Sequence, residues 1–232
     1  KVLFLSIIGF ENLNNHGIYS DLLRTFEKNG HEVYIVSSRE RKLKKPTEIS
    51  KEKNVTYLKL KVGNLTQTGI FEKGIATLLI ERQYKNAIKK YFSRVKFDLI
   101  LYHTPPITFC DVIRFVKKRD QAKTYLLLKD IFPQNAVDLG MMKKTGIKGL
   151  IYKFFRRKEK NLYEISDRIG CMSQANVDYV LKHNPEINPD KVEICPNSIE
   201  VIDKSVSAEM RIEFRKKYGI PLGKVVFVYG GN

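Results

Sequence analysis

The chain has 232 residues, of which 43% are hydrophobic, so it is long enough for one large or two small domains with a buried core. Its formal net charge of +17 favours polyanionic partners, namely nucleic acid, anionic lipid headgroups or phosphorylated substrates. The sequence lacks RNA-recognition, zinc-finger and helix-turn-helix signatures, and no run of about 18 uncharged apolar residues predicts a membrane-spanning helix. Three widely spaced cysteines, Cys110, Cys171 and Cys195, show no metal-binding pattern and are interpreted as small core residues in a reducing cytoplasm.

Strand-like and helix-like segments alternate along the chain. Residues 1–8 form a continuously apolar run typical of a buried strand, and residues 18–30 carry apolar residues at helical spacing. Further strands are predicted at 31–38, 55–60, 97–103, 123–130, 168–173, 191–196 and 226–229, and further helices at 72–93, 107–119, 146–165, 174–183 and 206–217. The Lys-rich stretch 38–54 is predicted to be a solvated loop.

The alternation predicts right-handed parallel crossovers and a doubly wound, mostly parallel, Rossmann-like α/β sheet. Polar residues near position 200 indicate a boundary, so residues 1–200 are expected to form one domain. Residues 201–232 would then supply a linker, a helix and the first strand of a second domain. Ligands of such sheets bind at the carboxyl ends of strands, which directs attention to residues 9–17, 103–106, 129–134, 173–174 and 196–198.

The loop "NNHGIYS" places His16 and Gly17 at the start of the first helix. Free N–H groups at a helix N-terminus favour an anion, and glycine permits close approach of the backbone. An ordinary turn with a glycine at the helix start is the alternative. The full dinucleotide pattern is absent, and Ser37 and Ser38 stand where an acidic residue is expected, so NAD binding is disfavoured.

Polar residues follow several other predicted strands. His103 stands at the end of the strand 97–103, and Lys129 and Asp130 end the strand 123–130. The lysine can bind phosphate and the aspartate can accept a proton from a sugar hydroxyl, while a plain ion pair between them is the alternative. Asn197, in "ICPNS", can bind a ligand or cap its loop. We find no Ser-His-Asp set, no metal-binding histidine cluster and no hydrolase-type pair of carboxylates.

The predicted helix 146–165 is both amphipathic and basic. Ile147, Leu150, Ile151, Phe154 and Phe155 recur at helical spacing. The basic residues expected to face an anionic membrane are Lys153, Arg156, Arg157 and Lys160. A helix that covers the sheet and exposes a solvated basic face is the alternative, and the two interpretations are compatible. The helix 72–93 is a second candidate for membrane contact.

Several motifs, taken in order, resemble glycosyltransferase family 4. They are the "HG" loop, "GHEVYIV", "HTPP", "KDIFPQNAVDLG", "EISDRIGCMSQAN", "VEICPNSIE" and the terminal "VFVYGGN". The resemblance is nearest to the bacterial branch that builds surface polysaccharides such as capsule and O-antigen. It implies the GT-B fold, in which two Rossmann-like domains face a cleft and bind the acceptor and the nucleotide-sugar. The terminal motif resembles the first strand and loop of the donor domain, so Gly230, Gly231 and Asn232 are expected on the donor side. On this interpretation the chain is truncated and inactive alone.

The resemblance also implies an activity and roles for residues. The activity is retaining sugar transfer from a nucleotide-sugar to a polyprenyl-pyrophosphate-linked glycan, without cofactor or metal. The protein is expected in the cytoplasm, peripheral at the inner membrane face, and nucleic acid is not expected as a partner. The residues expected to be catalytic are His103, Lys129 and Asp130. Lys129, which could stabilise charge, stands where many members have a histidine, so its catalytic role is left undefined, and Asp130 could hydrogen-bond the donor or the acceptor. The residues expected to bind substrate are His16, Gly17, Thr104, Ser173 and Asn197.

Two other functions are compatible with the same sequence. One is a GT-B relative that is not a transferase, such as a nucleotide-sugar epimerase, although such enzymes usually have more acidic clefts. The other is a stand-alone binding module for a phosphorylated ligand. The sequence indicates neither the donor sugar, the acceptor sugar, the linkage nor the oligomeric state.

Overall fold

The structure is a computed structural model that describes residues 1–64, 70–202 and 205–229, with the side chains of 70–78 and 147–148 left out. The chain divides into two compact units, Lys1–Ile199 and Glu200–Asn232. The second unit contains the helix α7 (Ala208–Lys217), and its described side chains are almost all exposed. The assignment of the two units to acceptor-binding and donor-binding domains stays a prediction.

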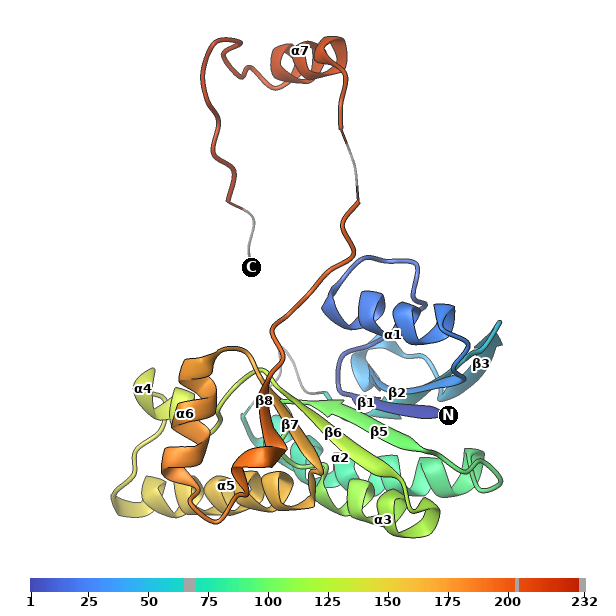
Figure 1. Ribbon diagram of the computed structural model, residues 1–232, viewed down its shortest axis with the longest axis vertical. Coiled ribbons are helices and arrows are strands. Elements are labelled where there is room, and N and C mark those ends of the chain that lie inside the picture. Colours follow the sequence, from blue (N-terminus) through green and yellow to red (C-terminus); the bar gives the residue numbers. More distant parts are fainter. Residues whose placement is uncertain (65–69, 203–204, 230–232) are drawn as a thin grey trace. The chain divides into compact units, whose positions relative to one another are not determined.

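The described strands of the first unit form one eight-stranded sheet in the order β3-β4-β2-β1-β5-β6-β7-β8 (Figure 1). All neighbouring strands are parallel except β3, which runs antiparallel to β4. The mostly parallel α/β fold predicted from the alternating pattern is therefore confirmed. The strands are β1 (Val2–Ser6), β2 (Val33–Glu40), β3 (Glu48–Glu52), β4 (Val55–Val62), β5 (Leu99–His103), β6 (Lys123–Leu128), β7 (Arg168–Cys171) and β8 (Val192–Ile194).

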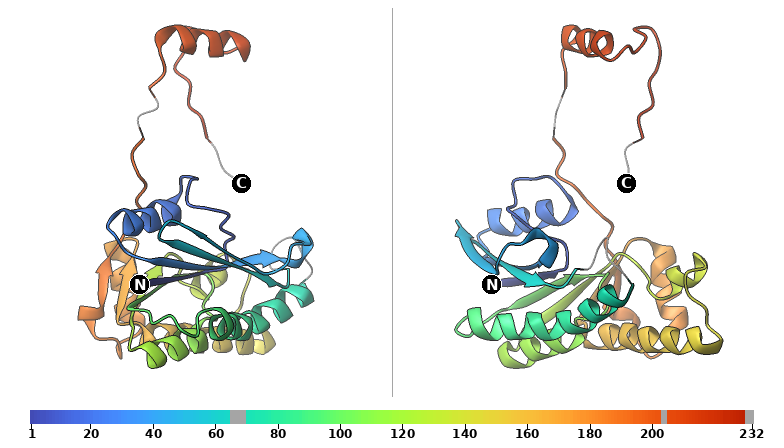
Figure 2. Two further views of the ribbon diagram at one scale, coloured as in Figure 1. Left: turned by 90° about the vertical axis from the view of Figure 1, so that its right-hand side faces the viewer. Right: turned by 180° about the vertical axis from the view of Figure 1, so that it is seen from behind.

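Helices cover the two faces of the sheet unequally, as Figure 2 shows. One face packs against α2, α3, α5 and α6, which contribute buried residues such as Tyr84, Val112, Leu162 and Val180 to the larger core. The opposite face packs against α1, whose Leu23 lies in a second core with Phe4 and Ile35. The first-unit helices are α1 (Ile18–Lys28), α2 (Ile70–Tyr91), α3 (Cys110–Asp120), α4 (Gln134–Asp138), α5 (Gly146–Ile165) and α6 (Gln174–His183), with 3₁₀ turns η1 (Arg41–Leu43) and η2 (Pro189–Lys191).

The strand order reverses at β1, which pairs with β2 on one side and β5 on the other. In open α/β sheets the connections leave such a point in opposite directions, and ligands bind at the carboxyl ends of the strands there. The ends concerned are Ser6 in β1 and His103 in β5. The fold therefore directs attention to the same edge of the sheet as the sequence did.

Two local predictions were wrong, and one short helix was missed. Residues 38–54 are not a loop, because β2 continues to Glu40 and β3 pairs with β4. The sequence of β3, EISKE, is mostly charged, which suits an exposed sheet edge and conceals the strand pattern. The short helix α4 was not predicted.

The second wrong prediction concerns the end of the described chain, where no strand forms at 226–229. A strand requires a neighbour to take its backbone hydrogen bonds, and within the described residues this segment has none. Its apolar side chains are exposed instead, with Phe227 at 94%. Gly230, Gly231 and Asn232, expected on a donor-side loop, lie outside the described residues.

The cysteines are free thiols, as expected. Cys110 and Cys171 are buried, and Cys195 is half-buried. Burial raises the pKa of Cys110 to about 12 and that of Cys171 to about 11, so both remain protonated at neutral pH. They serve as small core residues.

Candidate functional site

His103 lies at the point where the strand order reverses. Its Nε2 is 2.8 Å from the hydroxyl oxygen of Ser6, at the end of the neighbouring strand β1. The ring is 2% exposed and stacks on Tyr19 of α1, with 4.4 Å between ring centroids. Burial lowers the pKa of His103 to about 4, and the positive charge of Lys129 acts in the same direction. His103 is therefore a neutral hydrogen-bonding group at pH 7, covered by Tyr19.

Thr104 connects this point to the next strand. Its side chain is 1% exposed, and its hydroxyl oxygen accepts hydrogen bonds from the backbone N–H groups of Lys129, at 3.0 Å, and Asp130, at 3.1 Å. Thr104 therefore holds the segment after β6 in place. Its predicted contact with substrate stays a prediction.

Lys129 and Asp130 differ in their surroundings although they are adjacent. The half-buried Lys129 places Nζ 3.5 Å from the carbonyl oxygen of Cys195, and its burial lowers the pKa of the ammonium group. Asp130 is exposed, and no ion pair joins the two among the residues that the structure describes. The alternative of a simple strand-end ion pair is therefore wrong.

Tyr19 brings these groups into one neighbourhood. Its burial, together with the negative charge of Asp130, raises the pKa of the Tyr19 phenol to about 12. Tyr19 thus contacts His103 on one side and lies within the electrostatic reach of Asp130. The structure brings together Ser6, Tyr19, His103, Lys129 and Asp130, of which sequence reasoning missed the first two.

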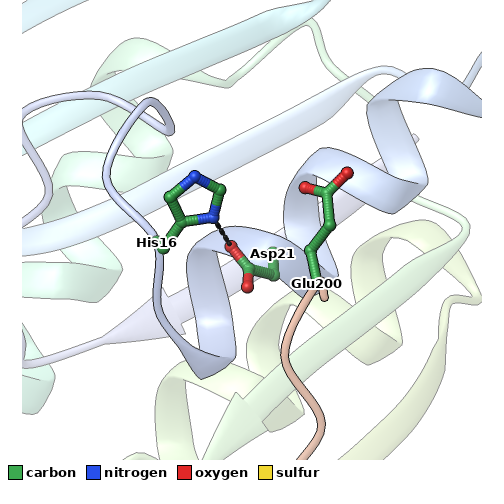
Figure 3. A group of neighbouring side chains, drawn as sticks. All are labelled: His16, Asp21 and Glu200. Carbon is green, nitrogen blue, oxygen red and sulfur yellow. Dashed lines mark ion pairs between the residues drawn. The ribbon is translucent and has the colours of Figure 1, made fainter. Parts of the chain in front are cut away.

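The start of α1 carries a built-in carboxylate. Asp21 is 5% exposed and accepts a hydrogen bond from the N–H of Gly17 at 3.3 Å and from Arg24 at 3.0 Å. His16 Nδ1 lies 3.4 Å from the same carboxylate oxygen (Figure 3). A Cβ on Gly17 would meet no atom within 4 Å, so the space before the helix is open. Asp21 already occupies one of the N–H groups expected to bind an anion.

Two more predicted substrate-binding residues are exposed beyond β7 and β8. Ser173 caps α6, since its hydroxyl oxygen accepts from the backbone N–H of Asn176 at 3.4 Å. Asn197 is exposed three residues after β8. Their contact with a substrate stays a prediction.

The four basic residues predicted to face a membrane are not equivalent. Arg156 donates to Glu159 at 2.6 Å, to the carbonyl oxygen of His183 at 2.8 Å and to Asn184 at 2.6 Å. Arg156 therefore ties α5 to the end of α6, a role inside the protein. Lys160 forms an exposed ion pair with Glu186 at 2.8 Å, whereas Lys153 and Arg157 are exposed.

Sequence reasoning also missed a second cluster of charged side chains at the carboxyl edge of the sheet. Arg39 of β2 and Lys59 of β4 are buried, with 4% and 9% of their side chains exposed. Lys59 pairs with Glu11 at 2.8 Å, and Arg39 pairs with Glu48 at 2.8 Å and with Glu11 at 3.7 Å. The hydrogen bond from Lys59 lowers the pKa of Glu11. Basic residues inside the apolar runs "YIVSSRE" and "YLKLK" were the signal available.

The sequence model of Glycosyltransferase Family 4 matches residues 19–201. The chain belongs to glycosyltransferase family 4. The matched range of this family includes Tyr19, His103, Lys129 and Asp130, and it begins after His16 and Gly17. None of the curated protein sequences matches the chain significantly.

Solved structures share the fold at low sequence identity. One is a trehalose-6-phosphate structure from E. coli bound with UDP-2-fluoro glucose, with TM-score 0.61 and 10% identity, covering 94% of this chain and 55% of that one. Another is Anabaena Alr3699/HepE in complex with UDP, with TM-score 0.53 and 12% identity, covering 94% and 50%. The OtsA apo structure gives TM-score 0.58 and 11% identity, covering 86% and 50%.

The chain thus spans about half the length of these structures, whose fold is GT-B. The mostly parallel sheet described above matches part of that fold.

Proposed function

We propose that the chain is the acceptor-binding part of a retaining glycosyltransferase. It would move a sugar from a nucleotide-sugar to a glycan on a polyprenyl pyrophosphate, in the synthesis of bacterial capsule or O-antigen. Family membership over residues 19–201 supports transferase chemistry, and UDP bound to Anabaena HepE supports a nucleotide-sugar donor. No described helix is long and apolar enough to cross a membrane. On this proposal, contact with a lipid-linked acceptor would occur at the inner face of the membrane.

The observation that carries the proposal is the group at the ends of β1, β5 and β6. Its members are a neutral buried histidine, a half-buried lysine without a carboxylate partner in the described chain, and an exposed aspartate. A cation that lacks its own counter-ion suits a ligand that brings negative charge. An acceptor or donor phosphate group supplies that charge.

The proposed chemistry divides roles among these residues. In sugar transfer the bond between the anomeric carbon and the diphosphate oxygen breaks, and the acceptor hydroxyl forms the new glycosidic bond and loses its proton. Lys129 would stabilise the negative charge that develops on the leaving phosphate. Asp130, which is exposed and anionic, would hydrogen-bond the reacting sugar hydroxyl and assist removal of its proton. The neutral His103 would position Tyr19 and Ser6, and no metal would be needed.

The test is a transfer assay with the full-length protein. It would be incubated in detergent or nanodiscs with radiolabelled UDP-sugars and polyprenyl-pyrophosphate-linked acceptors, with and without EDTA. Expected is a labelled lipid-linked product that retains the anomeric configuration of the donor, seen in NMR coupling constants, and that forms in EDTA. Epimerisation of the nucleotide-sugar with no transfer would instead support the epimerase alternative. Binding of nucleotide or pyrophosphate without turnover would support the binding module.

A further inference from the structure

One stretch of the first unit exposes large apolar side chains to solvent. It lies between the end of α4 and the middle of α5, residues 139–157, and we name it the α4–α5 tip. Exposed fractions are 72% for Leu139, 73% for Met141, 66% for Leu150, 50% for Ile151 and 42% for Phe154. Five large exposed apolar side chains in so short a stretch indicate a binding surface.

The helix α5 changes character along its length. Its C-terminal half is buried in the larger core through Leu162 and Tyr163. In its N-terminal half, Leu150, Ile151 and Phe154 recur at i, i+1 and i+4, so they share one side of the helix, and that side is exposed. The loop from α4 runs to this same end of α5 (Figure 1). Of the apolar residues whose pattern predicted sheet covering, Phe155 packs against the larger core, whereas Leu150, Ile151 and Phe154 are exposed.

The charge of this stretch has one sign. Residues 139–158 contain no Asp or Glu and include Lys143, Lys144, Lys148, Lys153, Arg156, Arg157 and Lys158. Arg156 is held by Glu159 and α6, and Lys158 lies 3.8 Å from Glu81. Lys143, Lys144, Lys153 and Arg157 are exposed beside the apolar residues. An exposed apolar group bordered by cations is the pattern of segments that lie in the interface of an anionic membrane.

We propose that the α4–α5 tip inserts its apolar side chains into the headgroup region of an anionic bilayer. Leu150, Ile151 and Phe154 would enter the acyl boundary, while Lys153 and Arg157 would contact lipid phosphates. Insertion, rather than attraction of a basic helix face alone, is the new element. A second copy of the chain is a less suitable partner for this surface, because two such basic stretches would then face and repel each other.

A packed chain of aromatic rings joins the tip to the candidate site. Phe154 packs on Phe155 with centroids 5.3 Å apart, and Phe155 packs on Phe132 at 5.1 Å. Phe132 stands two residues after Asp130. A tip seated in the bilayer would hold the proposed acceptor site next to the lipid that bears the acceptor. This link rests on the proposed function, whereas insertion itself does not.

The first experiment measures insertion residue by residue. The chain has no tryptophan, so Phe154→Trp provides a single emitter at the tip, and Leu43→Trp places one at an exposed apolar position of η1 as the matched control. Both would be mixed with vesicles of phosphatidylcholine and phosphatidylglycerol that contain brominated lipid. We expect a blue shift and quenching for Phe154→Trp and neither for Leu43→Trp. Equal emission shifts and equal quenching in the two variants would overturn the proposal.

The second experiment measures affinity by vesicle co-sedimentation. Leu150→Ser with Ile151→Ser should weaken partition into anionic vesicles by about tenfold or more, because each leucine-sized side chain contributes through its buried CH₂ groups. The control pair Leu43→Ser and Ile49→Ser, on exposed apolar positions elsewhere, should leave partition unchanged. Lys153→Gln with Arg157→Gln should weaken binding mainly at low salt.

Two results would count against a membrane occupant. One is partition that the tip variants leave unchanged. The other is self-association in sedimentation equilibrium that Leu150→Ser with Ile151→Ser abolishes while vesicles are ignored, which would identify a second copy instead. Insertion as expected, combined with no sugar transfer by the full-length protein, would leave this proposal standing and remove the proposed function.

Discussion

The two halves of the sheet's carboxyl edge treat their charged side chains differently. On the β2 and β4 side, Arg39 and Lys59 are buried and lie against the carboxylates of Glu48 and Glu11. On the β5 and β6 side, the half-buried Lys129 has no carboxylate partner within the described chain. A partly buried charge without a counter-ion lowers stability, so a protein retains one where a ligand supplies the opposite charge. The comparison separates charges that serve folding from those that we propose to serve binding.

The largest expected effect tests the binding side through Asp130. In the full-length enzyme, Asp130→Asn should lower kcat by about 100-fold or more, the range typical of a lost acid–base group. Radiolabel transfer to the lipid-linked acceptor measures it. Asp190→Asn is the control. Asp190 is exposed in η2, which directly precedes β8 and so lies at the amino end of a strand, away from the carboxyl ends that carry the candidate site. Unaltered turnover in Asp130→Asn would remove this residue from the site.

His103, which lies between the two halves, should make stability depend on pH. Its pKa is about 4 in the folded protein against an ordinary value of 6.5, so between these values the unfolded chain binds a proton that the folded chain does not. The free energy of unfolding should therefore fall as pH is lowered from about 6.5 to about 4, by up to ~3 kcal/mol, and be unaffected above about pH 7.

Urea titrations at several pH values check this prediction against His103→Gln, in which an amide takes the place of the ring. The difference in the free energy of unfolding between the two proteins should change with pH between about 6.5 and 4. Parallel profiles would mean that folding leaves the pKa of His103 unchanged.

Thr104 should contribute to stability through its hydrogen bonds to the backbone after β6. Thr104→Val removes the acceptor of two N–H groups and should lower the free energy of unfolding by about 2 kcal/mol. Thr108→Val is a matched control, since Thr108 is also buried and its hydroxyl has no hydrogen-bond partner among the described residues. That control should be near neutral. Equal losses for the two variants would show that cavity or shape effects dominate.

The smallest expected effects are changes in the free energy of unfolding when Arg39 or Lys129 loses its charge. Arg39→Met should lower stability by about 1–2 kcal/mol, because it breaks charge-assisted hydrogen bonds to Glu48 and Pro46. Lys129→Met should change stability by no more than about 0.5 kcal/mol, since the lost charge had no carboxylate partner in the described part of the chain. Urea denaturation of both variants provides the measurement. The reverse order would contradict the division between folding and binding charges.

The fold could be predicted because its information is local. Continuous apolar runs indicated the buried parallel strands, and α5 begins and ends where its pattern predicted. β3 was not predicted because an edge strand has little apolar surface to bury. It forms a strand through its pairing with β4. The expected strand at 226–229 did not form, because a strand pattern alone does not supply a neighbour to pair with.

The candidate site could be predicted only in position. The sequence nominated the carboxyl ends of several strands, and the structure places His103 and Lys129 at the ends of β5 and β6. The burial of His103, its contact with Ser6 and the role of Thr104 depend on residues far away in the chain. The same holds for Arg156, whose partners in and after α6 turn a presumed surface charge into an internal contact.

The central position of β1 has a consequence for the order of assembly. β1 pairs with β2, which follows soon after it, and with β5, whose His103 lies 97 residues beyond Ser6. A chain leaving the ribosome therefore presents one open edge of β1, fully apolar apart from Ser6, until β5 has been synthesised. Nascent-chain folding should stall at the β1-α1-β2 stage and complete only when β5 joins, because such distant pairing is slow. In the cell this interval is the time at which a chaperone would be needed.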